Sequence, residues 1–123
     1  MVIWFIGLSR AGKTTLSKLL YKKLKPNIEN LVLLDGDNIR NLFKNDIDHS
    51  LEGRYKNAER LSYLSKFLAD QNIHVIAGIT VFYITIFRLI YKFFSQSPKL
   101  MPASFMGQKL IAKLNHIFLY VAL

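Results

Sequence analysis

The segment VIWFIGLSRAGKTT spans residues 2–15, and the rest of the chain is organised around it. Residues 2–6 are a continuous apolar run rich in β-branched and aromatic side chains, as in strands buried within a parallel sheet. Residues 7–14 fill every fixed position of the pattern GxxxxGKS/T. Leucines then recur at helical spacing from Leu16 to Leu24. The segment therefore predicts a strand, a loop and a helix, in the order that a phosphate-binding loop requires.

The composition of this loop explains how it would bind phosphate. Gly7 and Gly12 permit backbone angles and a close approach that a Cβ atom would prevent. The N–H groups of the loop and of the helix N-terminus would then face a polyphosphate. We expect Lys13 to reach the β- and γ-phosphates and the Thr14 hydroxyl to hold Mg²⁺. The predicted nucleotide-binding positions are Gly7, Leu8, Ser9, Arg10, Ala11, Gly12, Lys13, Thr14 and Thr15. The alternative is a glycine turn before a basic helix.

A second apolar run, Leu31–Leu34, ends in the acidic segment DGDNIR. Ligands of open α/β sheets bind beyond the carboxyl ends of the strands, so Asp35 and Asp37 are expected at the edge that carries the phosphate loop. A carboxylate there can hold Mg²⁺ through water or accept a proton from an attacking hydroxyl. We assign such a role to Asp35. For Asp37 the alternative is that it or Asn38 caps a helix over Ile39–Phe43.

A polar connector (44–53) leads to a predicted helix (54–70) and a third strand (73–77). Arg54, Asn57 and Arg60 recur every three residues and so share one stripe of this helix. Such a stripe either binds phosphate or faces solvent, and spacing alone favours solvent.

Three segments together resemble the adenylylsulfate kinase (APS kinase) family: GLSRAGKTT, LLDGDNIR, and DIDHSLEGRYKNAERLSYLSKFLADQNIHVIA. The resemblance covers residues 1–80. It implies an α/β fold of the P-loop kinase type, with a parallel sheet flanked by helices. It also implies ATP and Mg²⁺ as cofactors and transfer of the γ-phosphoryl group to the 3′-hydroxyl of adenylylsulfate, a step of sulfate assimilation.

The resemblance also assigns roles to single residues. Lys13 and Asp35 become the catalytic residues, and Thr14 and Asp35 the residues that hold Mg²⁺. The acceptor-binding positions are Asp37, Arg40, His49, Arg54 and Asn57. Arg60 matches a family arginine whose role stays open.

Three departures from the family pattern lie on the acceptor side. The chain has Asp48-His49-Ser50 where the family has Gly-Phe-Ser, so His49 replaces an aromatic stacking residue. Gly53 and Lys56 replace two family acids. Two alternatives to an adenylylsulfate kinase therefore remain. One is a kinase of another nucleotide, such as cytidine diphosphoramidate in capsule phosphoramidate synthesis. The other is an inactive nucleotide-binding or membrane-associated fragment.

Residues 81–123 differ in composition and charge from the predicted kinase core at 1–80. All eight acids of the 123-residue chain precede Gln71, and the tail is aromatic and basic. Val81 stands where the family has a serine, and no lid segment follows. A frameshifted or truncated product is the favoured interpretation, which predicts a fold that is incomplete at its C-terminus and little activity. The alternatives are a replacement segment that packs on the sheet or a membrane, and a nucleic-acid-binding extension.

Composition narrows the remaining possibilities. The chain has no cysteine, which excludes a disulfide scaffold, a thiolate zinc site, an iron–sulfur cluster and a cysteine nucleophile. The net charge of +9 indicates an anionic partner. The apolar stretch Ile73–Phe87 is shorter than the roughly 20 residues of a spanning helix. We therefore expect a cytoplasmic protein that binds a small nucleotide and no nucleic acid, with membrane contact by the tail or a homodimer as alternatives.

Overall fold

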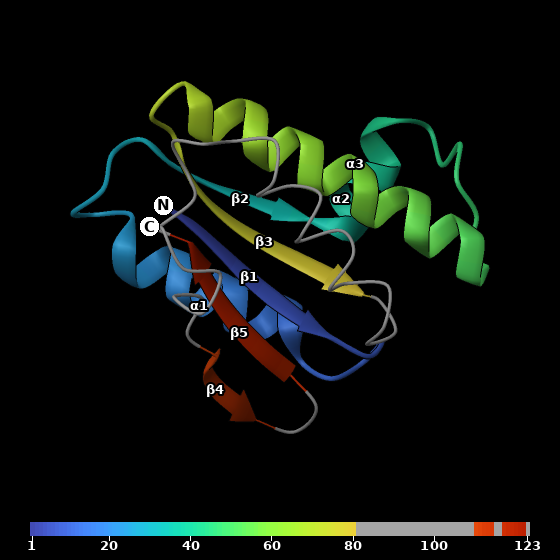
Figure 1. The fold of residues 1–123 in the computed structure, drawn as a ribbon, viewed down its shortest axis with the longest axis horizontal. Coiled ribbons are helices and arrows are strands. Elements are labelled where there is room, and N and C mark those ends of the chain that lie inside the picture. Colours follow the sequence, from blue (N-terminus) through green and yellow to red (C-terminus); the bar gives the residue numbers. More distant parts are fainter. Residues whose placement is uncertain (81–109, 115–116, 123) are drawn as a thin grey trace.

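A computed structural model describes residues 1–80, 110–114 and 117–122 of the chain (Figure 1). Their strands form one sheet in the order β2-β3-β1-β5-β4. Strands β1, β2 and β3 run parallel, whereas β5 is antiparallel to β1 and β4 is antiparallel to β5. In chain order the elements are β1 (Val2–Gly7), α1 (Lys13–Leu24), β2 (Leu31–Asp35), α2 (Gly36–Leu42), α3 (Leu51–Asp70), β3 (His74–Thr80), β4 (Leu110–Leu114) and β5 (Ile117–Ala122).

Strand β1 lies inside the sheet, between β3 and β5, and all of its residues are buried. This explains why its sequence is continuously apolar rather than alternating. Its side chains divide between the two faces, since successive residues of a strand point in opposite directions. Trp4 and Ile6 pack in the cluster that includes Leu61 of α3. Ile3 and Phe5 pack in the cluster that includes Leu20 of α1. Figure 1 shows α1 and α3 on opposite faces of the sheet.

The predicted parallel sheet flanked by helices is confirmed for β1, β2 and β3. Two predicted elements were too short. The third strand continues to Thr80, and α3 begins at Leu51 because the Ser50 side chain caps it by accepting a hydrogen bond from Gly53 N–H at 3.0 Å.

The start of α2 differs from the prediction in a way that matters for the site. Helix α2 begins at Gly36, not at Ile39, and its cap is Asp35 rather than Asp37 or Asn38. Oδ1 of Asp35 accepts hydrogen bonds from the backbone N–H groups of Asp37 and Asn38, at 3.1 and 3.3 Å. Asp35, the first carboxylate of the DGD segment, is the cap because its backbone is extended. This conformation places its side chain over the first turn of the helix.

The predicted tail is described only in part, as the two strands β4 and β5. Strand β5 pairs with the full length of β1, from Val2 opposite Ala122 to Gly7 opposite Ile117. The described residues do not include 81–109, 115–116 and 123. Val81 and much of the predicted tail therefore lie outside the described residues. The boundary at residue 80 stays a prediction. Within the described residues, no helix has the length and apolarity to cross a membrane.

Candidate active site

The phosphate loop joins β1 to α1 in the predicted order. Gly12 has a φ of 91°, in the left-handed region that favours glycine, and it is the N-cap of α1. Because this cap has no side chain, it leaves the first N–H groups of the helix for a ligand. The first turn of α1 carries no acidic residue. The positive end of the helix is therefore suited to an anion.

Lys13 is the first residue of α1, and its side chain is buried. Its Nζ donates to the carbonyl oxygen of Leu8 at 2.5 Å, so the lysine bends back over the loop that precedes it. Burial lowers the pKa of Lys13, the carboxylates of Asp37 and Asp35 oppose this shift, and Arg54 adds to it. A phosphate group that enters the loop would supply the counter-charge that the buried ammonium group needs.

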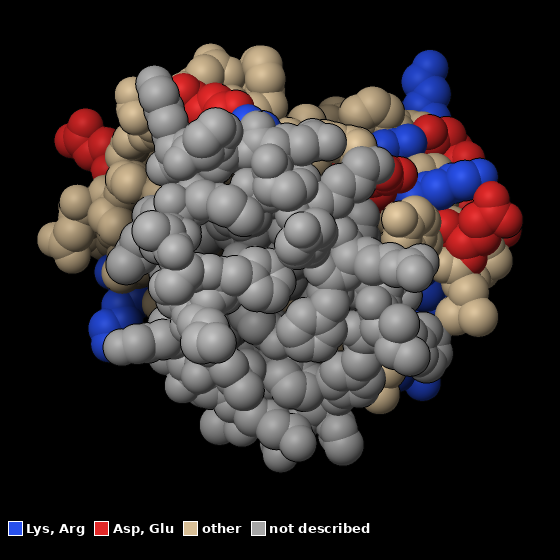
Figure 2. Space-filling view, in the orientation of Figure 1, with Lys and Arg blue, Asp and Glu red and all other residues tan. Residues whose placement is uncertain are grey.

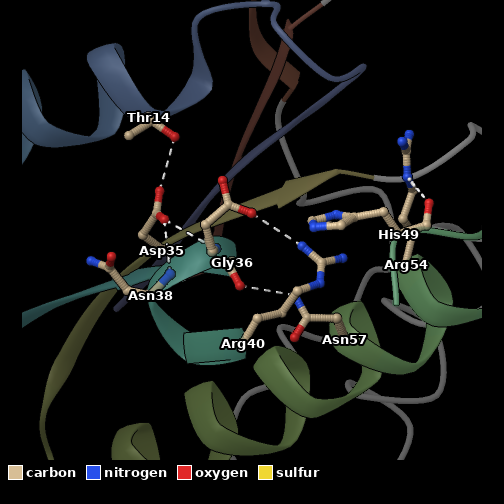
Figure 3. Close-up of polar contacts among 9 residues, drawn as sticks. Thr14, Asp35, Gly36, Asn38, Arg40, His49, Arg54 and Asn57 are labelled. Atoms are coloured by element: carbon tan, nitrogen blue, oxygen red, sulfur yellow. Dashed lines mark hydrogen bonds and ion pairs between the residues drawn. The ribbon is translucent and has the colours of Figure 1, made fainter. Parts of the chain in front are cut away.

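Asp35 connects the phosphate loop with the second strand (Figure 3). Its Oδ2 accepts a hydrogen bond from the Thr14 hydroxyl at 2.9 Å, while its Oδ1 caps α2. The residue is only 7% exposed. A hydroxyl oxygen and a carboxylate oxygen thus converge beside the loop, and oxygen atoms of this kind are the ligands that Mg²⁺ prefers. Thr14 and Asp35 are therefore the residues of this site whose oxygen atoms fit Mg²⁺.

Arg40 and Asn57 each carry a buried polar atom that has no hydrogen-bond partner among the described residues. Arg40 Nη1 donates to Asp37 Oδ1 at 3.1 Å, and Asn57 Nδ2 donates to the carbonyl oxygen of Gly36 at 3.1 Å. Within the described part of the chain, the buried Arg40 Nε and Asn57 Oδ1 have no hydrogen-bond partner. Such groups are normally satisfied in a folded protein. Both residues line the cavity described below, so the unpartnered donor and acceptor belong to residues of the site.

The predicted stripe of α3 is divided by the structure. Arg54 and Asn57 line the cavity described below, but Arg60 turns instead to Asp46. Arg54 Nε donates to the carbonyl oxygen of His49 at 2.9 Å. His49 itself is exposed, and its ring points toward Arg40 in Figure 3. The solvent-facing interpretation of the stripe therefore fails for Asn57, which is buried, whereas Arg54 and Arg60 are both partly exposed.

A cavity of about 410 Å³ brings most of the predicted residues together. It is lined by Ser9, Arg10, Gly12, Lys13, Thr14, Thr15, Asp35, Asp37, Arg40, Arg54 and Asn57. Gly7, Leu8, Ala11 and His49 were predicted for the site but do not line the cavity. Four basic side chains against two carboxylates make the lining cationic, which suits a polyphosphate.

Six further residues line the cavity that the sequence patterns did not predict: Gly36, Ala58, Leu61, Gly78, Ile79 and Thr80. Three of them belong to the end of β3, where a Cβ atom added to Gly78 would meet no atom within 4 Å. The signal was available, because β3 is parallel to β1 and its carboxyl end must lie at the same edge as the loop. A strand that ends at residue 77, as predicted, would not place residues 78–80 at this edge, whereas β3 continues to Thr80.

Comparison with known proteins places this site in context. The family model of adenylylsulphate kinase matches residues 1–96, beyond residue 80 where the resemblance by motif ended. A probable adenylyl-sulfate kinase of Pseudomonas aeruginosa is 40% identical over 77 residues, which are 63% of this chain and 36% of that protein. The cytidine diphosphoramidate kinase of Campylobacter jejuni is 38% identical over 92 residues, 75% of this chain and 51% of that protein. The chain thus spans a third to a half of these relatives.

A solved structure has the same fold. The APS kinase CysC of Mycobacterium tuberculosis in complex with AMPPNP and APS superposes with a TM-score of 0.63 at 30% sequence identity. The superposition covers 77% of this chain and 54% of that one.

Proposed function

The chain belongs to the adenylylsulphate kinase family, and on this premise we propose that it binds ATP and transfers the γ-phosphoryl group to a hydroxyl of a nucleotide acceptor. The first candidate acceptor is the 3′-hydroxyl of adenylylsulfate. One observation carries the proposal: Lys13, Thr14 and Asp35 converge in the same cavity as Arg40, Arg54 and Asn57. Groups suited to a triphosphate and groups suited to a second anion therefore share one chamber.

Phosphoryl transfer depends mainly on positioning and on stabilising charge. Lys13 and the N–H groups at the start of α1 would hold the β- and γ-phosphates in line with the acceptor hydroxyl. Asp35 would orient that hydroxyl or accept its proton as the new P–O bond forms and the bond to the β-phosphate oxygen breaks. Thr14 and Asp35 would hold Mg²⁺, which neutralises charge on the phosphate oxygens when bound. We place this chemistry in the cytoplasm.

The acceptor would lie on the α3 side of the cavity. Arg54 and Arg40 would supply donors for its anionic group, and Asn57 Oδ1 would accept a hydrogen bond from a hydroxyl or amino group of the same acceptor. Asp37 contributes indirectly, because its contact at 3.1 Å orients the Arg40 guanidinium.

A second candidate acceptor is a cytidine diphosphate derivative. The similarity to the cytidine diphosphoramidate kinase extends over 92 residues, against 77 for the P. aeruginosa relative. The residues that depart from the family pattern, His49, Gly53 and Lys56, surround Arg54 in the sequence, and Arg54 lines the cavity. An adenylylsulfate acceptor would place the reaction in sulfate assimilation, whereas a cytidine acceptor would not.

The test is an assay of ADP release with Mg·ATP and either adenylylsulfate or cytidine diphosphoramidate. We expect turnover with one acceptor, and a loss of at least about a hundredfold in Lys13→Ala because a buried cation at the phosphates is removed. Lys23→Ala is the matched control, since Lys23 is an exposed lysine at the other end of α1. Full activity of Lys13→Ala would refute the proposal. ATP binding without turnover on either acceptor would favour an inactive nucleotide-binding fragment.

A further inference from the structure

Arg60 lies on α3 outside the cavity, and its contacts run to the connector between α2 and α3. Its Nη1 and Nη2 donate to the two carboxylate oxygens of Asp46, at 3.0 and 2.6 Å. The same guanidinium stacks over the Phe43 ring, with 4.1 Å between Cζ and the ring centroid. Arg60 thus ties the end of α2 and the start of the connector to α3. Because both partners are partly exposed, the ion pair contributes little to stability, and its main effect is positional.

The second half of the connector is folded tightly onto the first turn of α3. Asp48 Oδ1 accepts hydrogen bonds from the backbone N–H and the hydroxyl of Ser50, at 3.1 and 2.5 Å. A Cβ atom at residue 53 would overlap the carbonyl oxygen of Asp48. The connector can therefore pack this closely only because residue 53 is glycine. The family acid that Gly53 replaces would not fit this arrangement.

The backbone between these two anchors holds a residue of the site. The carbonyl oxygen of His49 accepts the hydrogen bond from Arg54 Nε (Figure 3). This bond engages Nε and leaves the two terminal nitrogens of Arg54 for a bidentate contact with an anion. Arg54 lines the cavity, whereas Arg60 and Asp46 do not. Figure 2 shows basic and acidic side chains interspersed at the right of the view, where α2 and the start of α3 lie in Figure 1.

We propose that Arg60 is a positioning residue for acceptor binding: it fixes the connector through Asp46, and the His49 carbonyl of the fixed connector orients Arg54 toward the cavity. The inference rests on the proposed function and names how the acceptor's anionic group is recognised. An ordered arginine binds a sulfate or phosphate group more tightly than a free one, because its conformational entropy is lost before the ligand arrives.

The experiment measures dissociation constants of adenylylsulfate, of CDP and of Mg·ATP for the full chain by titration calorimetry. We expect Arg60→Ala to weaken binding of the better acceptor probe about tenfold, the scale of one charged hydrogen bond. The affinity for Mg·ATP should change less than about twofold, because the contacts of Arg60 with the described residues run to Phe43 and Asp46 and not to the phosphate loop. Arg60→Lys should give an intermediate loss, since an ammonium group cannot form the bidentate pair.

A double-mutant cycle separates positioning from general destabilisation. If Arg60 acts through Arg54, then Arg60→Ala added to Arg54→Ala causes no further loss of acceptor affinity. Additive losses overturn the inference. Lys66→Ala is the matched control, because it removes another ion pair of α3, to Asp70 at 2.5 Å, at the end of the helix away from the connector. This control should leave acceptor binding unchanged.

Unchanged acceptor affinity in Arg60→Ala, or an equal loss of ATP affinity, overturns the inference, as does a wild-type chain that binds neither acceptor probe. Should Arg60→Ala fail to fold, Arg60→Lys and Asp46→Asn carry the same comparison. Acceptor binding that depends on Arg60, but without phosphoryl transfer, refutes the proposed function and supports the positioning role.

Discussion

Lys13 is the residue at which burial and charge oppose each other most directly. Its ammonium group is buried, its pKa is lowered mainly by that burial, and the nearby Asp37 and Asp35 compensate in part. The free protein therefore holds a destabilised cation where the proposed function needs one. A bound triphosphate would relieve this condition, because it adds negative charge beside the ammonium group.

The affinity for Mg·ATP should consequently fall at alkaline pH. Below the lowered pKa of Lys13 the side chain is charged with or without ligand, so binding takes up no proton from it. Above that pKa, binding must reprotonate the lysine, and the affinity falls by up to about tenfold per pH unit. Calorimetry from about pH 7 to about pH 10 measures this slope. Lys13→Arg should remove it, since arginine stays charged. An equal slope in that variant would contradict the explanation.

The unliganded protein should show the opposite sign over the same range. A pKa that is lower in the folded state than in the unfolded state means that the unfolded chain binds more protons between the two values. The contribution of Lys13 to the free energy of unfolding therefore rises with pH in that window.

At the scale of single elements, α2 links the fold to the chemistry. Asp35 ends β2, caps α2 with one carboxylate oxygen and accepts from Thr14 with the other. The structural and chemical roles thus belong to different atoms of one side chain. They can be separated by a substitution that keeps the cap and removes the charge.

Asp35→Asn should separate them. Asparagine caps helices about as well as aspartate, so the free energy of unfolding should fall by no more than about 1 kcal/mol, the cost of losing a charge at a helix N-terminus. Phosphoryl transfer should fall by about a hundredfold or more, because an amide accepts no proton. Asp35→Ala should lose the cap as well, at a further cost of about 1 kcal/mol. Urea unfolding and initial rates measure the two effects. An active Asp35→Asn variant would exclude Asp35 as the proton acceptor.

At the scale of the whole molecule, β1 is the strand on which the rest depends. It is paired on both sides and buried on both faces, between the cluster of α3 and the cluster of α1. The phosphate loop begins where β1 ends, so the loop is built only if this sheet forms. Ligand binding to the loop therefore reports whether the sheet has formed.

Mg·ATP should raise the thermal stability of the chain. At a hundred times its dissociation constant, a ligand that binds only the folded state adds about 2.7 kcal/mol. Differential scanning calorimetry should show one cooperative transition that moves upward with ligand concentration. Lys13→Ala should melt cooperatively but without the shift. If the wild-type chain melts without cooperativity, then residues 1–80 do not form a stable core.

Short-range patterns predicted most of the fold, and within the site they predicted the phosphate loop and Asp35. The strand, loop and helix of GLSRAGKTT were predictable because their spacing and glycines act within a few residues, and Asp35 followed from the rule that ligands bind at strand ends. The roles of the loop and acceptor residues toward their ligands stay predictions. His49 was assigned to the site by resemblance, yet its ring is exposed and outside the cavity lining.

Tertiary structure alone settled the contacts that join distant segments. The sequence could not show that Arg60 turns to Asp46, that Gly53 admits the connector, or that β5 pairs with β1, because each contact joins elements whose distance is set by packing. The stripe of Arg54, Asn57 and Arg60 is a single pattern in sequence, but the sheet below it and the connector beside it separate its members. Local backbone preferences act over a few residues, whereas burial and side-chain partners are properties of the assembled core.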